Sequence, residues 1–359
     1  MHRRRGRPAA VRRRPRLRHQ RQGGLQAQPR PLDQRPHHQG NVQSADGLSL
    51  SVHGGGVTRV RYVTLDVFTD RAFGGNQLAV FPDAREIPEE LLLTVTREFN
   101  YSETTFCYPP SDPRFSSTVR IFTPGAEVPF AGHPTVGTAI ALVQLGLAGT
   151  LDGESQLLLD EKVGPIPVTV RATPHGAYFA QFSVAQLPEF GTSAPSRGKL
   201  AEILLLDPED ILGAPMAPAG VSCGLPFLMV PLRSVDAVAR ARVRIDAWES
   251  TLKGSWASEL FVFAKDPSGG ENHLHARCFV PGLNVPEDPA TGSANAGLAG
   301  YLASKSTIQD GTLRWTVDQG VEMGRPSRLE IEADKVAGAI TAVRVGGHAV
   351  MVCDGTIAI

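Results

Sequence analysis

The stretch that decides the fold is Phe130–Ala139, FAGHPTVGTA, which runs directly into the apolar segment IALVQLGLAG. A helix that is apolar on every side is buried on every side, so this pattern predicts a central helix from about Pro134 to Leu145. Proline suits the first helical position, where no backbone N–H is needed, and Gly132 lets a ligand approach without meeting a β-carbon. Such a start is either a plain helix cap in a surface loop or a binding site.

A second stretch, Glu287–Leu302, EDPATGSANAGLAGYL, repeats this design in the other half of the chain. Each half places strands and one surface helix before the loop, and further strands after the apolar helix. Burying such a helix requires a sheet that curls around it. We therefore predict an α+β fold of two pseudo-symmetric domains, each a curled, mostly antiparallel sheet around a central apolar helix.

The expected domain boundaries follow this repeat. We place the N-terminal domain at residues 58–187 and the C-terminal domain at 188–345, and we expect 346–359 to return to the first domain. A segment rich in Pro, Ser and Gly, about residues 187–220, is interpreted as the linker between them.

Residues 1–57 differ from the rest in composition, with twelve Arg, no Lys and two acidic residues. The remainder holds 24 of the 36 basic and 34 of the 36 acidic residues, so the tail is positive and the body negative. We expect this arm to be disordered, and its composition fits a nucleic-acid-binding segment or a transit peptide. A third interpretation is that native translation starts near Val57, since no methionine lies between Met1 and Met216 and GGGV fits a ribosome-binding site before a GTG start.

The overall composition is that of a globular protein. Apolar residues make up 42% and charged residues 20%, and no apolar run approaches the roughly eighteen residues of a membrane span. The four cysteines are far apart and form no C-x-x-C pair, which argues against a disulfide framework and a zinc site. We expect a soluble protein of the cytoplasm that binds neither membranes nor nucleic acids.

The two helix starts together predict an anion-binding site. The first N–H groups of a helix have no partner within the helix and carry roughly half a positive charge. If both starts open into one cleft, the backbone and small side chains of four residues would grip a carboxylate: Gly132, Thr291, Gly292 and Ser293. The repetition favours this site over two plain caps.

Three side chains near these loops are candidates for proton chemistry. Glu103 follows a helix in EFNYSETTF, where aromatic neighbours would desolvate its carboxylate, raise its pKa and make it a usable base near neutrality. The alternative for Glu103 is a solvated loop glutamate. His133 is a candidate for substrate binding or proton transfer, and otherwise a cap histidine bonded to nearby backbone. Asp288 is either a second carboxylate of the site or an N-cap ahead of Pro289.

Other motifs are weaker. Gly220–Gly224, GVSCG, fits the G-x-S-x-G nucleophile elbow but lacks the preceding strand and following helix that this turn needs. His273 and His275 share one face of a predicted strand, without an evident third ligand for a metal. The sequence contains no dinucleotide or P-loop phosphate motif, so we expect no cofactor and no metal.

These motifs resemble the PhzF family of phenazine-biosynthesis-like isomerases and epimerases, which share the fold of diaminopimelate epimerase. The matching segments, in order, are YVTLDVFTDRAFGGNQLAVF, EFNYSETTF, RIFTPGAEVPFAGHPTVGTAIAL, EDPATGSANAGLAGYL and QGVEMGRPSRLEI. The resemblance extends over about Arg61–Ile359 and leaves out the tail. It implies two similar domains with the active site in the cleft between them, and a homodimer by analogy with other proteins of this fold.

The resemblance also implies a reaction and its residues. The family's enzyme of phenazine biosynthesis moves a proton within trans-2,3-dihydro-3-hydroxyanthranilate without a cofactor. The family's acid/base glutamate falls on Glu103, its histidine on His133 and its aspartate on Asp288. Its backbone and small polar contacts fall on Gly132, Gly292 and Ser293. The cysteine pair of diaminopimelate epimerase has no counterpart in these motifs.

The sequence therefore predicts a cofactor-independent isomerase or epimerase that moves a proton within a small carboxylate, with Glu103 as acid and base. The alternative is a protein that binds a small carboxylate in the same cleft without converting it. A nucleic-acid-binding protein that uses the Arg-rich tail is a third hypothesis, which the acidic body disfavours.

Overall fold

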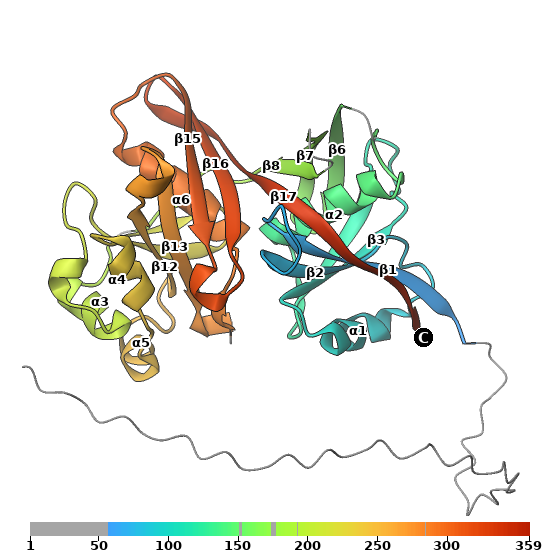
Figure 1. Cartoon of the computed structure of the whole chain (residues 1–359), viewed down its shortest axis with the longest axis horizontal. Helices are drawn as coiled ribbons and strands as arrows, with labels where there is room; N and C mark the ends of the chain where they lie inside the picture. The colour runs from blue at the N-terminus through green and yellow to red at the C-terminus, as the bar shows by residue number, and fades with distance from the viewer. Residues whose placement is uncertain (1–56, 151–152, 174–176, 192, 284) are drawn as a thin grey trace, which may run out of the picture. The chain divides into compact units, whose positions relative to one another are not determined.

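The computed structural model describes residues 57–150, 153–173, 177–191, 193–283 and 285–359, which belong to one unit spanning Gly56–Ile359 (Figure 1). The predictions made for the tail, residues 1–56, lie outside the described residues. The described chain has a mixed α+β structure, as the sequence predicts. Within these ranges no helix has the length and apolarity needed to cross a membrane.

Strands from the first half of the chain, together with the C-terminal strand β17, form a closed ring around helix α2 (Gly132–Gln144). Hydrogen-bonded pairing runs β1–β2–β3–β4–β6–β7–β8–β17 and returns from β17 to β1. Only the β2–β3 and β4–β6 pairs of this ring are parallel. The strands are β1 Arg59–Val67, β2 Asn76–Phe81, β3 Glu103–Tyr108, β4 Ser117–Phe122, β6 Glu154–Glu161, β7 Gly164–Ala172, β8 Tyr178–Ser183 and β17 Ala339–Ala358.

The second half repeats this pairing order around helix α6 (Gly292–Lys305). Pairing runs β10–β11–β12–β13–β15–β16–β17, and the parallel pairs β11–β12 and β13–β15 fall at the same places in the order. Because α6 packs against strands from both ends of this order, the sheet wraps around it. The strands are β10 Ala219–Ser222, β11 Pro226–Pro231, β12 Glu259–Lys265, β13 His273–Val280, β15 Gly311–Gln319 and β16 Ser327–Val336.

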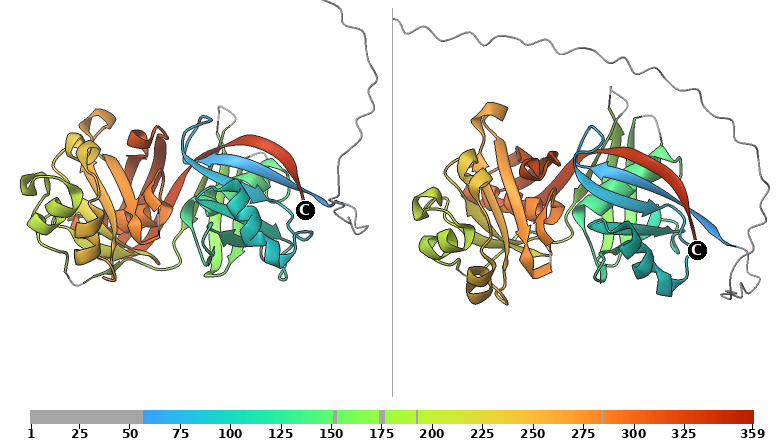
Figure 2. Two further views of the ribbon diagram at one scale, coloured as in Figure 1. Left: turned by 90° about the horizontal axis from the view of Figure 1, so that it is seen from below. Right: turned by 60° about the horizontal axis from the view of Figure 1, so that its bottom comes forward.

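Strand β17 belongs to both sheets. It pairs with β16 up to Gly346, with β8 over Arg344–Ala349 and with β1 over Ala349–Ala358. Figure 2 shows its last part alongside β1. It is a single strand of 20 residues that continues without a break through Gly346 and Gly347.

The two central helices are buried, as their apolar composition predicts. In α2 every residue from Gly132 to Val143 is buried. The small residues are needed for this packing: a β-carbon on Gly137 would lie 2.5 Å from Leu78 Cδ2 and one on Gly297 would lie 2.7 Å from Met229 Cε. Side chains of α2 and α6 belong to one hydrophobic cluster, which holds both helices in place.

Two expectations about helices are wrong. Helix α2 begins at Gly132 rather than Pro134, and Ala131 is its N-cap. Proline at the third position is tolerated because the N–H groups of the whole first turn lack helical partners. The supposed linker contains α3 (Arg197–Leu204), whose N-cap Ser196 accepts a hydrogen bond from Lys199 and whose apolar side is buried.

Short elements complete the described chain. The remaining strands are β5 Glu127–Val128, β9 Glu189–Phe190 and β14 Val285–Asp288, and the remaining α-helices are α1 Leu92–Phe99, α4 Val235–Arg240 and α5 Ile245–Thr251. The β14 strand pairs with β13 and leads into the start of α6.

Candidate active site

The starts of α2 and α6 touch each other at two glycines. A β-carbon on Gly132 would lie 2.7 Å from the Cα of Gly292, and one on Gly292 would lie 2.8 Å from the Cα of Gly132. Any side chain at either position would therefore separate the helices. Since both helix starts carry partial positive charge, an anion between or beside them would relieve their mutual repulsion.

Glu103 is the first residue of β3 and lies beside His133. Its side chain is 18% exposed, and its Oε2 atom is buried, 3.3 Å from His133 Nε2, without meeting hydrogen-bond geometry. Burial raises the pKa of Glu103 to about 8, and the negative charge of Asp288 adds to this effect. The carboxyl group therefore exchanges its proton in a range suited to general acid and base work.

His133 is the second residue of α2 and is 4% exposed. Burial lowers its pKa to about 3, so the imidazole is neutral at physiological pH. Its Nδ1 atom lies 3.2 Å from the Asn76 side-chain amide. A neutral imidazole can form a hydrogen bond with Glu103 and leave the charge of its carboxylate intact. A protonated imidazole would instead neutralise that charge.

Asp288 ends β14 and faces the same group of residues. Its Oδ1 accepts a hydrogen bond from Asn76 Nδ2 at 2.9 Å and its Oδ2 accepts one from Thr291 Oγ1 at 2.5 Å. Burial raises the pKa of Asp288 to about 6, and these two hydrogen bonds oppose the shift. Asp288 is not the N-cap of α6, a position held by Thr291, so the simple capping alternative is wrong.

Thr291 and Ser293, the small polar residues at the start of α6, differ in their surroundings. Thr291 turns its hydroxyl toward Asp288, while its N–H donates to Gln319 Oε1 at 3.3 Å. Ser293 is half-buried and takes the position in α6 that His133 takes in α2. The structure therefore brings Glu103, His133 and Asp288 together with both helix starts.

Asn76 was missed by the sequence reasoning, although it joins the two halves of the site. It is 1% exposed, and its Nδ2 approaches three acceptors: His133 Nδ1, Asp288 Oδ1 and the Ala290 carbonyl at 3.0 Å. The available signal was its place directly after Gly74 and Gly75, at the start of an apolar strand.

Arg325 was also missed. It donates to the carbonyl of Gly75 at 3.0 Å, to the carbonyl of Gly74 and to Asp66 Oδ1 at 2.6 Å. Asp66 is 4% exposed and also accepts from the N–H of Phe73. This arginine therefore holds the loop that presents Asn76.

The weaker motifs lie outside this site and have structural partners. His273 bonds Asp318 at 2.9 Å and His275 bonds Glu322 at 2.7 Å. Among the described residues no group of His, Cys, Asp or Glu is arranged to hold a metal. The GVSCG motif lies at the end of β10 and leads into β11, so no helix follows it.

The cysteines do not form a pair of reactive thiols. Cys107, Cys223 and Cys278 are buried and Cys353 is exposed, and all are free. Burial raises the pKa of Cys107 and Cys223 to about 12 and that of Cys278 well above its usual value. Cys278 is paired in register with Asp288, but a thiol this resistant to ionisation is a poor base.

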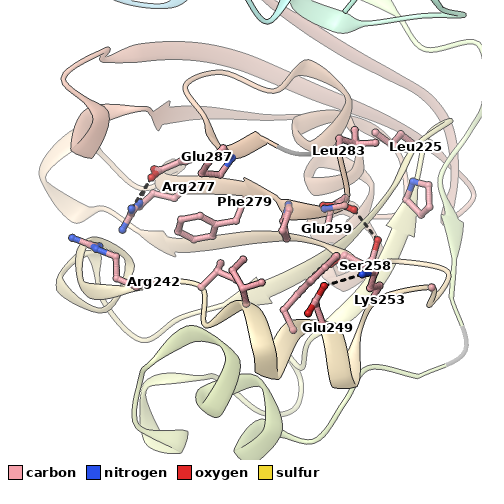
Figure 3. Close-up of a pocket in the computed structure, with 18 of the residues that line it drawn as sticks. Leu225, Arg242, Glu249, Lys253, Ser258, Glu259, Arg277, Phe279, Leu283 and Glu287 are labelled. Carbon is pink, nitrogen blue, oxygen red and sulfur yellow. Dashed lines mark hydrogen bonds and ion pairs between the residues drawn. The ribbon is translucent and has the colours of Figure 1, made fainter. Parts of the chain in front are cut away.

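A cavity of about 1090 Å³ lies elsewhere in the second half, among α5, β13 and β14 (Figure 3). Two ion pairs lie in its lining, Arg277 with Glu287 at 2.7 Å and Lys253 with Glu249 at 2.8 Å. Its lining does not include Glu103, His133 or Asp288. The cavity is therefore separate from the candidate active site.

Comparison with known proteins shows to which family the chain is related. A family model described as phenazine biosynthesis-like protein (PhzC-PhzF) matches residues 65–355. An uncharacterized isomerase of Mesorhizobium japonicum is 39% identical over 299 residues, which cover 82% of this chain and 98% of the relative. The trans-2,3-dihydro-3-hydroxyanthranilate isomerase of Pseudomonas aeruginosa is 31% identical, with the same coverage.

A solved structure supports the fold. The PhzF-family phenazine biosynthesis protein of Bacillus anthracis superposes with a TM-score of 0.76 at 25% identity, covering 84% of this chain and 100% of that one. Together with the family match and the 39% identical relative, this shows that the chain belongs to the phenazine biosynthesis-like (PhzF) family, whose named relatives include isomerases.

Proposed function

We propose that the protein is a cofactor-independent isomerase or epimerase that moves a proton within a small carboxylate substrate. The observation that carries the proposal is the 3.3 Å approach of Glu103 Oε2 to His133 Nε2, directly beside the contact between the two helix starts. The two pseudo-symmetric repeats would form two domains. The first would comprise residues 58–187 and 346–359, and the second residues 188–345.

The helix starts would hold the substrate carboxylate. The backbone N–H groups of Gly132, His133, Gly292 and Ser293 occupy first-turn positions that have no helical acceptor. Fixed dipoles of this kind stabilise an anion without reorganising during the reaction. They would also stabilise the charge that develops when a neighbouring carbon loses its proton.

Glu103 would act as base and then as acid. In its ionised form it removes a proton from a carbon next to the carboxylate or next to a ring double bond, and the electron pair of the broken C–H bond enters the adjacent π-system. The protonated Glu103 then returns that proton to another carbon, or to the other face of the same carbon. No oxidant or reductant is needed, because atoms and electrons balance within the substrate.

His133, Asp288 and Asn76 would orient the substrate and Glu103. Asp288, ionised above its pKa of about 6, is the acceptor for a substrate hydroxyl or amino group. The first substrate to test is trans-2,3-dihydro-3-hydroxyanthranilate, the compound in the name of the 31% identical relative. A homodimer remains part of the proposal, and analytical ultracentrifugation of the full chain tests it.

The experiment is proton NMR in D₂O with a panel of small carboxylates that includes this compound. Wild type is compared with Glu103→Gln and with the control Glu98→Gln, which changes an exposed glutamate on α1. Deuterium should enter a substrate carbon with wild type and Glu98→Gln only. Compounds that bind but never exchange would instead support a carboxylate-binding protein.

A further inference from the structure

Glu161 is a buried acid that the proposed reaction does not use. It is the last residue of β6 and is 3% exposed. Its Oε1 lies 2.8 Å from Thr135 Oγ1, and its Oε2 is buried without a hydrogen-bond partner. A carboxylate in this position would leave one charged oxygen unsolvated, which is costly.

The number of protons that Thr135 can donate bears on whether Glu161 is protonated or ionised. Thr135 Oγ1 also lies 2.8 Å from the carbonyl of Ala131, the N-cap of α2. A hydroxyl has one proton to donate, and a carbonyl can only accept. If the hydroxyl donates to Ala131, the contact between Thr135 and Glu161 needs a proton that belongs to Glu161.

The second repeat contains the same arrangement with a neutral side chain. Gln319 is the last residue of β15, as Glu161 is of β6, and it is 0% exposed. Gln319 Oε1 accepts from Asn295 Nδ2 at 2.9 Å. Asn295 is the fourth residue of α6, as Thr135 is of α2, and its Nδ2 also donates to the carbonyl of the N-cap Thr291 at 3.0 Å. A residue at the strand end thus contacts the fourth residue of each central helix, and in the second repeat that residue carries no charge.

We propose that Glu161 is a positioning residue that works as a neutral carboxylic acid and keeps the first turn of α2, with Gly132 and His133, in its substrate-binding geometry. This inference rests on the proposed function for its effect on catalysis. The protonation of Glu161 itself does not depend on that function.

The surrounding charged groups leave the carboxylate form of Glu161 unsupported. On β3 a negative charge on Glu161 would add to the raised pKa of the buried thiol of Cys107. Asp160 accepts from Thr118 at 3.2 Å, and Lys162 is paired with Glu127 at 3.4 Å. Burial raises the pKa of Glu161 to about 8, opposed by the Thr135 hydrogen bond. Above that pH the carboxylate would draw the Thr135 hydroxyl away from Ala131.

The first test needs no substrate. Infrared spectra of wild type and Glu161→Gln, with Glu127→Gln as control, are compared at about pH 6 and about pH 10. Glu127 is a matched control because Arg120 and Lys162 lower its pKa. Glu103 is also protonated at the lower pH and contributes to the same protonated-carboxyl band. The proposal therefore expects this band to lose the contribution of one carboxyl group in Glu161→Gln and to keep its full intensity in Glu127→Gln. A spectrum of Glu161→Gln identical to wild type in this band overturns it.

The second test separates substrate binding from turnover. Between about pH 7 and about pH 10, KM of wild type should rise about three- to tenfold. This factor corresponds to the free energy that one hydrogen bond typically contributes. KM of Glu161→Gln should lack this additional rise, because its amide imitates the neutral acid, while the effects of Glu103 ionisation on KM and kcat are the same in both proteins. An equal KM rise in both proteins contradicts the proposal. If no substrate is converted, the proposed function fails and the infrared result still decides the state of Glu161.

Discussion

Gly132 and Gly292 meet where α2 and α6 begin, so close that a β-carbon on either would lie within 2.8 Å of the other's Cα. Gly132→Ala or Gly292→Ala should therefore push the helix starts apart, at a cost of about 1–3 kcal/mol in the free energy of unfolding. The larger effect should be on KM, because the proposed function has both helix starts hold the substrate carboxylate.

The control for these variants is Gly198→Ala in α3, where a β-carbon meets nothing within 4 Å. This change should leave KM unchanged and slightly raise the free energy of unfolding, since alanine favours helix. Steady-state kinetics and chemical denaturation measure both quantities. A Gly132→Ala protein with the KM of wild type would show that the contact between the helices does not shape the site.

The raised pKa of Glu103 predicts the pH profile. Only its ionised form can take a proton, so kcat/KM should rise with pH through about 8. Asp288→Asn removes a negative charge that raises this pKa, so the rising limb should move to lower pH even though the rate itself falls. A limb that stays in place or moves to higher pH in Asp288→Asn would refute the assignment.

Asn76 connects His133 with Asp288. Asn76→Ala would leave the half-buried Asp288 carboxylate without its amide donor, and hydrogen bonds to charged groups contribute about 1.5–3 kcal/mol. We expect kcat/KM to fall about ten- to hundredfold. Gln77→Ala is the control, because the side chain of this neighbour is exposed. Equal activities of the two variants would exclude a role for Asn76.

Arg325 is expected to stabilise the fold through Asp66. The arginine side chain is 22% exposed and that of Asp66 5% exposed. Arg325→Met leaves this buried carboxylate unpaired, which should cost about 3–5 kcal/mol in the free energy of unfolding. Asp66→Asn combined with Arg325→Met should recover part of the loss. If Arg325→Met denatures like wild type, the pair does not hold the loop.

The sequence predicted the two central helices because uniform apolarity over many residues has a single physical explanation, burial. Glu103, His133 and Asp288 were predicted with them, because they adjoin the helix loops or resemble family motifs. Asn76 was missed because its partner Asp288 lies 212 residues away, and no local pattern encodes that hydrogen bond.

The α3 helix was missed for a different reason. Its eight residues lie among Pro, Ser and Gly, and their apolar spacing stabilises a helix only once Leu200 and Leu204 pack against a core that the rest of the chain provides. The pairing of Glu161 with Thr135 was hidden in the same way, since it needs the end of β6 to meet the first turn of α2.

The measurement that tests the central claim most directly is the deuterium content of substrate carbons after incubation in D₂O with wild type and with Glu103→Gln. The account predicts that wild type incorporates deuterium at a specific carbon and that Glu103→Gln, although it binds the same compound, incorporates none. Incorporation at the wild-type rate by Glu103→Gln would show that another group moves the proton.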